Sequence, residues 1–438
     1  MSNASARILV VGGGGREHAL AWKLAHCRGV DEVLVAPGNA GTATEWHCRN
    51  VDVAADDLAG LLQLAQAEEV ALTVVGPEAP LAAGIADRFQ AEGLRLFGPS
   101  RAAARLEASK VFSKALLTRH GIPTAAYRSF DAAGPAREYV RTKGAPIVVK
   151  ADGLAAGKGV VVATSVEEAQ SAVTAMFAGR FGAAGAHVII EDLLVGEEAT
   201  YIVVASGTDY VPLASSQDHK RALDDDKGPN TGGMGAYSPA PVVSRAVEAR
   251  IRSRIIEPTL RALAAAGTPF TGFLYAGLMI DAAGDPSVVE FNVRLGDPEA
   301  QPLLMRLDSD LLELLDAAVD GRLVDVATPR WKPEAALGVV MAAAGYPAAP
   351  RKGDRIAGLD AGAADGQKVF QAGTRRDAAG HVVTSGGRVL CVCALGRDLY
   401  AAAQGAYRRV ATIHFEGAHF RHDIGHRALP PPTTRDST

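Results

Sequence analysis

Residues 7–15 read RILVVGGGG, a short apolar run that ends in four glycines. Such a run is typical of a buried strand, and the glycines permit a tight turn after it. Three more apolar runs follow in the first hundred residues, each closed by glycine or proline: Glu32–Ala36, Ala71–Val75 and Leu94–Phe97. Because helix-like stretches separate these runs, the pattern predicts a doubly wound parallel sheet.

Ligands of such sheets bind beyond the carboxyl ends of the strands, which here predicts a site at Gly12–Gly15, Pro37–Gly41 and Gly76–Pro80. A dinucleotide fingerprint fails, because Glu17 stands where a small residue should let the helix pack. The second strand also ends in Ala36 without an acidic residue for a ribose hydroxyl. NAD is therefore disfavoured. What remains is a helix N-terminus that cradles one phosphate, or a tight turn without a ligand.

A second informative strand is Val288–Arg294, VVEFNVR. Side chains alternate along a strand, so Glu290, Asn292 and Arg294 should share one face. The intervening residues should pack behind them: Val289, Phe291 and Val293. Two neighbouring oxygen ligands suit Mg²⁺, and an arginine suits an anion. The alternative is a solvent-exposed polar face on an edge strand.

Composition limits the class of protein. The 438 residues exceed one hydrophobic core and suggest roughly three domains. With 45 basic and 49 acidic residues the net charge is −4, which argues against a nucleic-acid partner. No apolar run reaches the roughly 18 residues of a membrane helix, and no secretory signal is evident. We therefore expect a cytoplasmic protein without a membrane partner, and a disordered tail from Pro430 to Thr438.

The cysteines lack the spacing of a disulfide framework or a zinc site: Cys27, Cys48, Cys391 and Cys393. Cys391 and Cys393 alternate on one predicted strand, so we expect buried thiols.

The segment from Ser109 to Ala163 predicts a helix followed by two strands. Ser109 is a suitable N-cap for a helix from Lys110 to about His120. Strands Pro146–Lys150 and Gly159–Ala163 flank a glycine-rich loop that is not a Walker motif, because only three residues separate its first two glycines. A loop joining two strands predicts a hairpin lid over phosphates.

Lys110 and Lys150 stand at a helix start and a strand end, from which ammonium groups could reach phosphates. Solvated lysines are the alternative. Glu191 and Asp192 end an apolar run before a chain reversal at 196–198. That hinge suits a purine edge and a ribose, or is an acidic surface turn. The loop Ser215–Tyr237 lacks hydrophobic periodicity and is dense in polar residues, so it is either a substrate loop or disordered.

Six segments in matching order resemble the phosphoribosylamine–glycine ligase family, ATP-grasp enzymes of purine biosynthesis. They are GPEAP at 76–80, KADGLAAGKG at 150–159, SQDHKR at 216–221, GPNTGGMGAYSP at 228–239, GFLYAGLMID at 272–281 and EFNVRLGDPE at 290–299. The similarity extends from about Arg7 to Arg427.

The resemblance implies a multidomain α/β and α+β fold. It comprises an N-terminal doubly wound domain of residues 1–103, an ATP-grasp core of 104–122 and 191–325, a lid domain of 123–190, and a C-terminal α+β domain of 326–438. The last fits apparent strands and a helix at Leu337–Met341, Val369–Ala372, Arg388–Leu395 and Asp398–Val410.

The implied reaction joins glycine to 5-phospho-β-D-ribosylamine through glycyl phosphate, with ATP converted to ADP and phosphate. Another ATP-grasp carboxylate–amine ligase or carboxylase would share the nucleotide site but not the Ser216–Pro239 loop. A silent nucleotide-binding protein would not need Glu290, Asn292 and Arg294 together. The implied partners are small molecules, and the implied state is a monomer or weak homodimer.

By the same resemblance, Glu290 and Asn292 hold Mg²⁺ or Mn²⁺, and Arg294 orients the glycine carboxylate and the acyl phosphate. Lys110 and Lys150 share the catalytic role by neutralising phosphate charge. Residues implied to bind ATP are Lys110, Lys150, Gly153, Gly157, Lys158, Glu191, Asp192, Leu193, Leu194 and Glu198. Residues implied to bind the sugar phosphate or glycine are Gly13, Gly14, Gly15, Asn39, Gly41, Glu78, Pro80, Asp218, Thr231, Gly232, Gly233, Arg294 and Gly296. Asp297 and Pro298 also fit a plain helix start, with Asp297 as N-cap.

Overall fold

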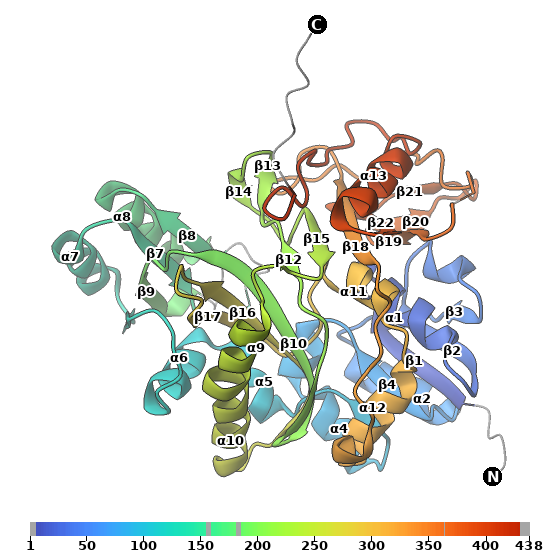
Figure 1. Ribbon diagram of the computed structural model, residues 1–438, viewed down its shortest axis with the longest axis horizontal. Helices are drawn as coiled ribbons and strands as arrows, with labels where there is room; N and C mark the ends of the chain where they lie inside the picture. The colour runs from blue at the N-terminus through green and yellow to red at the C-terminus, as the bar shows by residue number, and fades with distance from the viewer. Residues whose placement is uncertain (1–5, 155–158, 181–184, 363, 430–438) are drawn as a thin grey trace, which may run out of the picture.

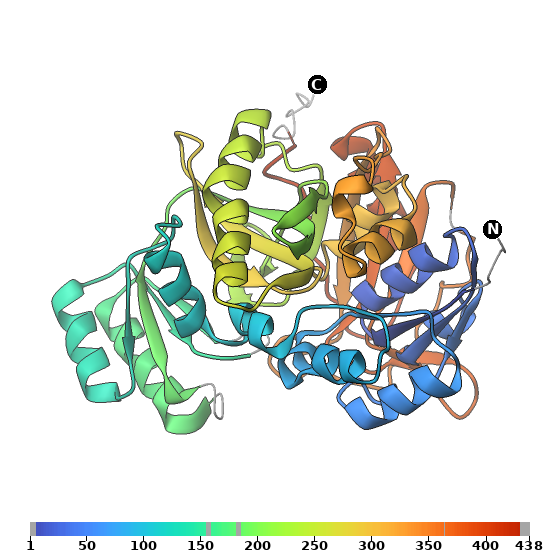
Figure 2. The same cartoon turned by 90° about the horizontal axis from the view of Figure 1, so that it is seen from below.

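The structure is a computed structural model that describes residues 6–154, 159–180, 185–362 and 364–429. Figure 1 shows an elongated molecule, with the N-terminal sheet and the C-terminal part side by side at one end. A small sheet formed by strands between residues 127 and 192 makes up the other end in both views, and a sheet formed by strands between residues 197 and 292 lies between them (Figure 2). No helix among the described residues is long and apolar enough to cross a membrane.

The N-terminal sheet is parallel and has the order β3-β2-β1-β4-β5, which confirms the predicted doubly wound fold. Its strands are β1 (Ala6–Gly12), β2 (Val30–Pro37), β3 (Cys48–Asn50), β4 (Leu72–Val75) and β5 (Leu96–Phe97). The helices are α1 (Gly15–Ala25), α2 (Leu58–Ala67), α3 (Glu78–Ala83) and α4 (Ile85–Ala91), with the short η1 (Thr42–Thr44). Ile8–Val11 are fully buried, as expected of a strand covered on both faces. The short polar strand β3 had no hydrophobic signal in the sequence.

Two helices lead from this sheet into the rest of the molecule: α5 (Arg101–Ala108) and α6 (Lys110–Arg119). The Ser109 hydroxyl accepts a hydrogen bond from the Phe112 backbone N–H at 3.1 Å. The predicted helix and its N-cap are therefore confirmed.

The lid sheet has the order β6-β9-β7-β8. It contains β6 (Tyr127–Phe130), β7 (Ile147–Ala151), β8 (Val160–Ala163) and β9 (Val188–Asp192), with α7 (Ala133–Lys143), α8 (Val166–Ala175) and η2 (Met176–Arg180) beside it. Because β7 and β8 pair antiparallel, with Lys150 opposite Val160, the glycine-rich loop does join a hairpin as predicted. Its residues Gly157 and Lys158 lie outside the described residues.

The central sheet is antiparallel with the order β11-β10-β16-β17. Its strands are β10 (Glu197–Gly207), β11 (Asp209–Pro212), β16 (Phe270–Ile280) and β17 (Pro286–Asn292). The helical segments α9 (Arg245–Ile251), η4 (Arg252–Ile256) and α10 (Glu257–Ala265) pack against it. The predicted β16–β17 hairpin is confirmed.

A bulge interrupts the alternation that the sequence predicted along β17. Gly277 pairs with Glu290 but Leu278 pairs with Val288, so Val289 has no opposite residue on β16. Val288 is then buried, whereas Val289 is only partly buried, and both residues line a cavity. The prediction that Val289 packs behind the polar face is wrong. The predictions for Phe291 and Val293 are confirmed, since both are buried.

The C-terminal sheet has the order β12-β15-β18-β22-β19. Its strands are β12 (Gln217–Asp218), β15 (Gly235–Ser238), β18 (Ala335–Ala342), β19 (Gln367–Gln371) and β22 (Arg388–Gly396). Neighbouring elements are the hairpins β13 (Arg221–Leu223) with β14 (Lys227–Asn230) and β20 (Thr374–Arg376) with β21 (Val382–Thr384), the helices α11 (Ala300–Arg306), α12 (Leu311–Val319) and α13 (Leu399–Val410), and η5 (Leu323–Asp325).

Two strands of the 215–237 loop therefore join the C-terminal sheet, through pairing of β15 with β18. The alternative that this loop is disordered is wrong. The sheet also runs across the predicted boundary at residue 326, and the exact domain limits stay a prediction. Cys391 and Cys393 are buried side by side with their sulfurs 3.6 Å apart, which confirms the expected buried thiols.

Candidate active site

A cavity of about 750 Å³ lies between the lid sheet, the central sheet and the loops around β12–β15. It brings together predicted residues from distant parts of the chain. Those that line it are Glu78, Lys110, Lys150, Gly153, Glu191, Asp192, Leu193, Leu194, Glu198, Asp218, Thr231, Gly232, Glu290, Asn292, Arg294 and Gly296. Most of the predicted nucleotide, metal and substrate residues thus face one space.

A smaller cavity of about 400 Å³ lies beside the N-terminal glycine loop and is lined by Gly13, Gly14 and Asn39. Asp297 and Arg388 line both cavities, so the two adjoin. Asp297 is not the predicted N-cap, because α11 begins at Ala300. Its carboxylate instead accepts a hydrogen bond from Gln301 and lies 3.6 Å from Arg388.

Four predicted substrate residues line neither of these cavities: Gly15, Gly41, Pro80 and Gly233. Close packing explains the glycines, since an added Cβ would lie 2.5 Å from Gln301 at Gly15, 2.5 Å from His18 at Gly41 and 2.4 Å from Pro298 at Gly233. Pro80 is buried within α3. These four residues are closely packed in this structure, and their substrate-binding role stays a prediction.

The phosphate cradle expected at the start of α1 is partly occupied by the chain itself. The Gly14 N–H donates to the Glu17 carboxylate, which is buried under the loop. A Cβ at Gly76 would lie 2.0 Å from the same carboxylate. The residue that breaks the dinucleotide fingerprint therefore fills the space beneath the turn. Asn39 is similarly engaged, because its amide donates to the Gly13 and Gln371 carbonyls at 3.0 and 2.7 Å.

Glu290 and Asn292 face the larger cavity from β17. Burial tends to raise the pKa of Glu290, but the ammonium groups of Lys220, Lys150 and Lys110 outweigh it and lower the pKa to about 2. Glu290 is thus an ionised oxygen donor beside the Asn292 amide. No group of three His, Cys, Asp or Glu side chains able to hold a metal occurs within the described ranges. Two protein oxygens with remaining ligands from phosphates and water fit a hard divalent cation.

Arg294 is held between two carboxylates from other elements. Its Nη2 donates to Glu107 Oε1 at 2.8 Å and its Nε to Glu78 Oε2 at 3.1 Å. Glu107 Oε2 also accepts from the Val293 backbone N–H at 2.8 Å. Despite burial, Glu107 and Glu78 raise the pKa of Arg294 above its ordinary value. Glu107 was not predicted from the sequence, because a charged residue on a short alanine-rich helix gives no sign that it is buried.

The predicted lysines are fixed by contacts inside the site. Lys110 Nζ donates to the Gly153 carbonyl at 3.1 Å, and Lys150 Nζ to the Val289 carbonyl at 3.1 Å. The bulge at Val289 therefore aims a carbonyl at Lys150. Glu191 is buried and lies 2.9 Å from the Lys150 ammonium, so it is not the exposed hinge carboxylate of the surface-turn alternative.

Lys114 is a second site residue that was not predicted from the sequence. It lies one turn after Lys110 on α6, is 4% exposed, and its Nζ is 3.2 Å from Glu191. Burial lowers the pKa of Lys114 to about 8, although Glu191 opposes this shift. The spacing Lys110 to Lys114 was the available signal, because residues four apart share a helix face. One Glu191 oxygen is buried without a hydrogen-bond partner in the part of the chain that the structure describes.

Lys220 lies among three acidic side chains that line the same cavity: Glu198, Asp218 and Glu290. Lys220 pairs with Glu198 and lies 3.5 Å from Glu290, so Glu198 is partly exposed and in contact with a lysine. Asp218 is buried nearby, and burial raises its pKa although Lys220 opposes this. Thr231 donates to the Lys220 carbonyl at 2.8 Å, and Arg388 donates to the Gly232 carbonyl.

His219 lies between Asp218 and Lys220 and is fully buried. We therefore expect the stability of the protein to depend on pH through this residue. Its Nε2 accepts the Gly425 N–H at 2.9 Å, and burial lowers its pKa to about 4. Because the unfolded histidine binds a proton more readily, its contribution is full above about pH 6.5 and is lost as the pH falls. We expect about 3 kcal/mol of unfolding free energy to be lost by pH 4 through this group.

Chemical denaturation of the wild type and His219→Gln at pH 7 and pH 4.5 measures this loss. The difference in unfolding free energy between the wild type and His219→Gln should become smaller at the lower pH. The wild type loses stability when His219 is protonated, whereas glutamine can accept the Gly425 N–H without titrating. His381→Gln, at an exposed position, is the matched control. A gap that does not change with pH contradicts the assignment.

Comparison with known proteins gives matches across the chain. Models of phosphoribosylglycinamide synthetase match residues 6–107 (N domain), 108–300 (ATP-grasp domain) and 336–427 (C domain). A phosphoribosylamine–glycine ligase of Xanthomonas axonopodis pv. citri is 60% identical over 424 residues, which cover 97% of this chain and 98% of the relative.

Solved structures agree with the family matches. The phosphoribosylamine–glycine ligase of Thermotoga maritima has a TM-score of 0.81 and 33% identity, covering 96% of this chain and 100% of the other. The biotin carboxylase domain of the Hydrogenobacter thermophilus 2-oxoglutarate carboxylase has a TM-score of 0.72 at 14% identity, covering 94% of this chain and 91% of the other, and shares the fold. The resemblance seen in the sequence motifs is confirmed. The chain belongs to the phosphoribosylglycinamide synthetase family, the ATP-grasp phosphoribosylamine–glycine ligases of purine biosynthesis.

Proposed function

We propose that the larger cavity is where the chain, as an ATP-dependent carbon–nitrogen ligase, joins glycine to 5-phospho-β-D-ribosylamine. The observation that supports this is the convergence on one cavity of an ionised carboxylate at Glu290, a clamped guanidinium at Arg294 and two lysines beneath a hairpin lid. Phosphoryl transfer depends on positioning and on charge neutralisation, and these groups supply both.

In the first step, a glycine carboxylate oxygen attacks the γ-phosphorus of ATP, and ADP leaves with the electrons of the broken P–O bond. The product is glycyl phosphate. In the second step, the ribosylamine nitrogen attacks the carbonyl carbon, phosphate leaves with the C–O electrons, and the nitrogen gives up one proton. The glycine carboxylate cannot react directly with the amine, because its leaving group would be oxide. In the acyl phosphate, a mixed anhydride, the leaving group is phosphate.

Arg294 would orient the glycine carboxylate, since Glu107 and Glu78 fix its guanidinium plane. Lys110 and Lys150 would neutralise the ATP phosphates, with Gly153, Gly157 and Lys158 of the lid covering them. Glu290 and Asn292 would hold Mg²⁺, or Mn²⁺, and the metal, when bound, neutralises charge between the phosphates. The segment between the lid sheet and β10 would bind the adenine and the ribose. Its residues with this proposed role are Glu191, Asp192, Leu193, Leu194 and Glu198.

The sugar phosphate would lie where the two cavities adjoin, near Asp297 and Arg388. Gly13, Gly14 and Asn39 border that place from the N-terminal side, and Asp218, Thr231 and Gly232 from the other. The Gly14 N–H and the Asn39 amide are already engaged, and Nη1 of Arg388 donates to the Gly232 and Asp297 carbonyls. We therefore expect Nε and Nη2 of Arg388 to carry much of the phosphate recognition. A cytoplasmic location and a monomeric or weakly dimeric state stay predictions.

ADP release separates this function from that of another ATP-grasp ligase or carboxylase. Purified protein with Mg²⁺ and ATP should form ADP and glycinamide ribonucleotide only when glycine and freshly prepared phosphoribosylamine are both present. Replacing glycine with bicarbonate, a carboxylase substrate, should give no product above background. ADP formation that is complete without the amine, or that yields no glycinamide product, contradicts the proposal.

A further inference from the structure

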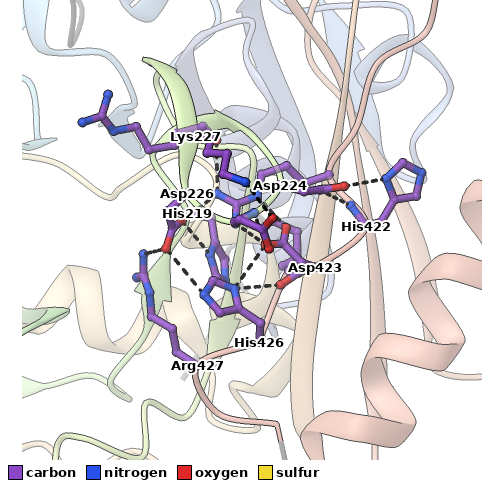
Figure 3. Close-up of polar contacts among 12 residues, drawn as sticks. His219, Asp224, Asp226, Lys227, His422, Asp423, His426 and Arg427 are labelled. Atoms are coloured by element: carbon purple, nitrogen blue, oxygen red, sulfur yellow. Dashed lines mark hydrogen bonds and ion pairs between the residues drawn. The ribbon is translucent and has the colours of Figure 1, made fainter. Parts of the chain in front are cut away.

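We propose that residues 419–427, here called the C-terminal strap, hold the loop that contains Asp218 and Lys220 in its place in the wall of the catalytic cavity. Asp226 is the residue of this loop region to which the strap is anchored. The inference rests on the proposed function, because it assigns that loop to the sugar phosphate. Figure 3 shows the strap residues His422, Asp423, His426 and Arg427 gathered against Asp224, Asp226 and His219.

Asp226 joins two strap arginines. Its Oδ1 accepts from Arg421 Nη1 and its Oδ2 from Arg427 Nη2, both at 2.8 Å. Arg421 is fully buried, and its other donors are used by Asp423 at 2.7 Å and by the Arg221 carbonyl at 3.2 Å. A buried guanidinium needs all these partners, so the strap is tied firmly to the turn between β13 and β14.

The strap is also joined to this hairpin along its backbone. The His422 N–H donates to Asp224 Oδ1 at 2.8 Å, and the Asp225 N–H donates to Asp423 Oδ2 at 2.9 Å. The Gly425 N–H donates to His219 Nε2 at 2.9 Å. Bonds therefore run in both directions between the strap and residues 219–226.

These contacts reach the cavity directly. Arg427 lines it together with Asp226, and Arg427 Nη1 donates to the Asp218 carbonyl at 3.3 Å. His219, which binds the strap, lies in sequence between Asp218 and Lys220. Loosening the strap should therefore displace the side chains of Asp218 and Lys220, which flank His219 in the sequence. Lys220 touches Glu198, which is proposed to bind the ribose of ATP. Lys110 and Lys150, which are proposed to bind the ATP phosphates, lie on α6 and β7 outside this network, so the KM for ATP should rise less than the KM for phosphoribosylamine.

The test compares Asp226→Asn with Asp225→Asn. The control makes the same change one residue away, where the side chain is 76% exposed and pairs only loosely with the exposed Lys227. We expect Asp226→Asn to raise the KM for phosphoribosylamine about tenfold, the effect of losing one charge-assisted hydrogen bond. The KM for ATP should stay within about twofold, and Asp225→Asn should match the wild type.

Asp423→Asn separates positioning from direct contact and serves if Asp226→Asn does not fold. Asp423 binds Arg421 but does not line either described cavity. The Asp423→Asn variant should also raise the KM for phosphoribosylamine. An effect of Asp226→Asn without one of Asp423→Asn overturns the positioning role, as does an equal rise in both substrate KM values. If the wild type itself forms no glycinamide ribonucleotide, the proposed function fails instead.

Discussion

Glu290→Ala is expected to lower kcat by more than about a hundredfold, the cost of removing a group that neutralises charge in the transition state. Glu290 is the only carboxylate on the predicted metal-binding face of β17, and three lysines hold it ionised with a pKa of about 2. Alanine leaves Asn292 as a single protein oxygen for the metal. The fold should survive, because Lys220 keeps its ion pair with Glu198.

Three measurements check this expectation: the rate of glycinamide ribonucleotide formation at saturating ATP, its dependence on Mg²⁺ concentration, and the circular dichroism melt. The Mg²⁺ concentration for half-maximal rate should rise in the variant. Glu313→Ala makes the same change at an exposed position of α12 and should match the wild type. If the kcat of the Glu290→Ala variant stays within tenfold of the wild-type value and its dependence on Mg²⁺ is unchanged, the assignment of Glu290 as a metal ligand is contradicted.

Arg294→Lys is expected to lower kcat/KM for glycine by about a hundredfold or more, because an ammonium cannot reproduce a planar, multiply bonded guanidinium. The structure adds a second reason. Arg294 binds Glu107 and Glu78 through different nitrogens, and the Glu107 side chain is only 7% exposed. A lysine that reaches one carboxylate leaves the other without its partner, at a cost of about 1–3 kcal/mol.

Steady-state kinetics with glycine varied at fixed ATP and phosphoribosylamine measure this loss. Arg254→Lys is the matched control, because Arg254 also pairs with a carboxylate, Asp285, but on an exposed surface. That control should retain wild-type kinetics. Near-normal glycine kinetics in Arg294→Lys would contradict the proposed orientation of the carboxylate.

Several elements could be predicted from the sequence because their signals are local. The N-terminal strands are apolar runs closed by turn residues, and α6 begins at a serine cap. The β7–β8 hairpin is two short runs around a glycine loop. Glu290 and Asn292 follow the alternation of a strand, and Arg294 continues it just beyond the end of β17. In each case the decisive interactions join residues a few positions apart, so the chain itself carries the information.

Other features depend on contacts between residues far apart in sequence. Glu107 and Lys114 read as ordinary helix charges until the fold buries them against Arg294 and Glu191. The bulge that turns the Val289 carbonyl toward Lys150 depends on how β17 pairs with β16. Such pairing leaves no pattern in either strand alone, because it is selected by the packing of the whole sheet.

Local sequence patterns were enough to predict the doubly wound N-terminal sheet, the hairpin lid, the polar face of β17 and, through the motifs, the family. Three features became visible only in the folded chain: β12 and β15 join the C-terminal sheet, Glu17 fills the space under the glycine turn, and the strap binds Asp226. Burial explains the difference. A charge or a short polar strand is stable in the interior only with a specific partner, and only the folded chain identifies that partner.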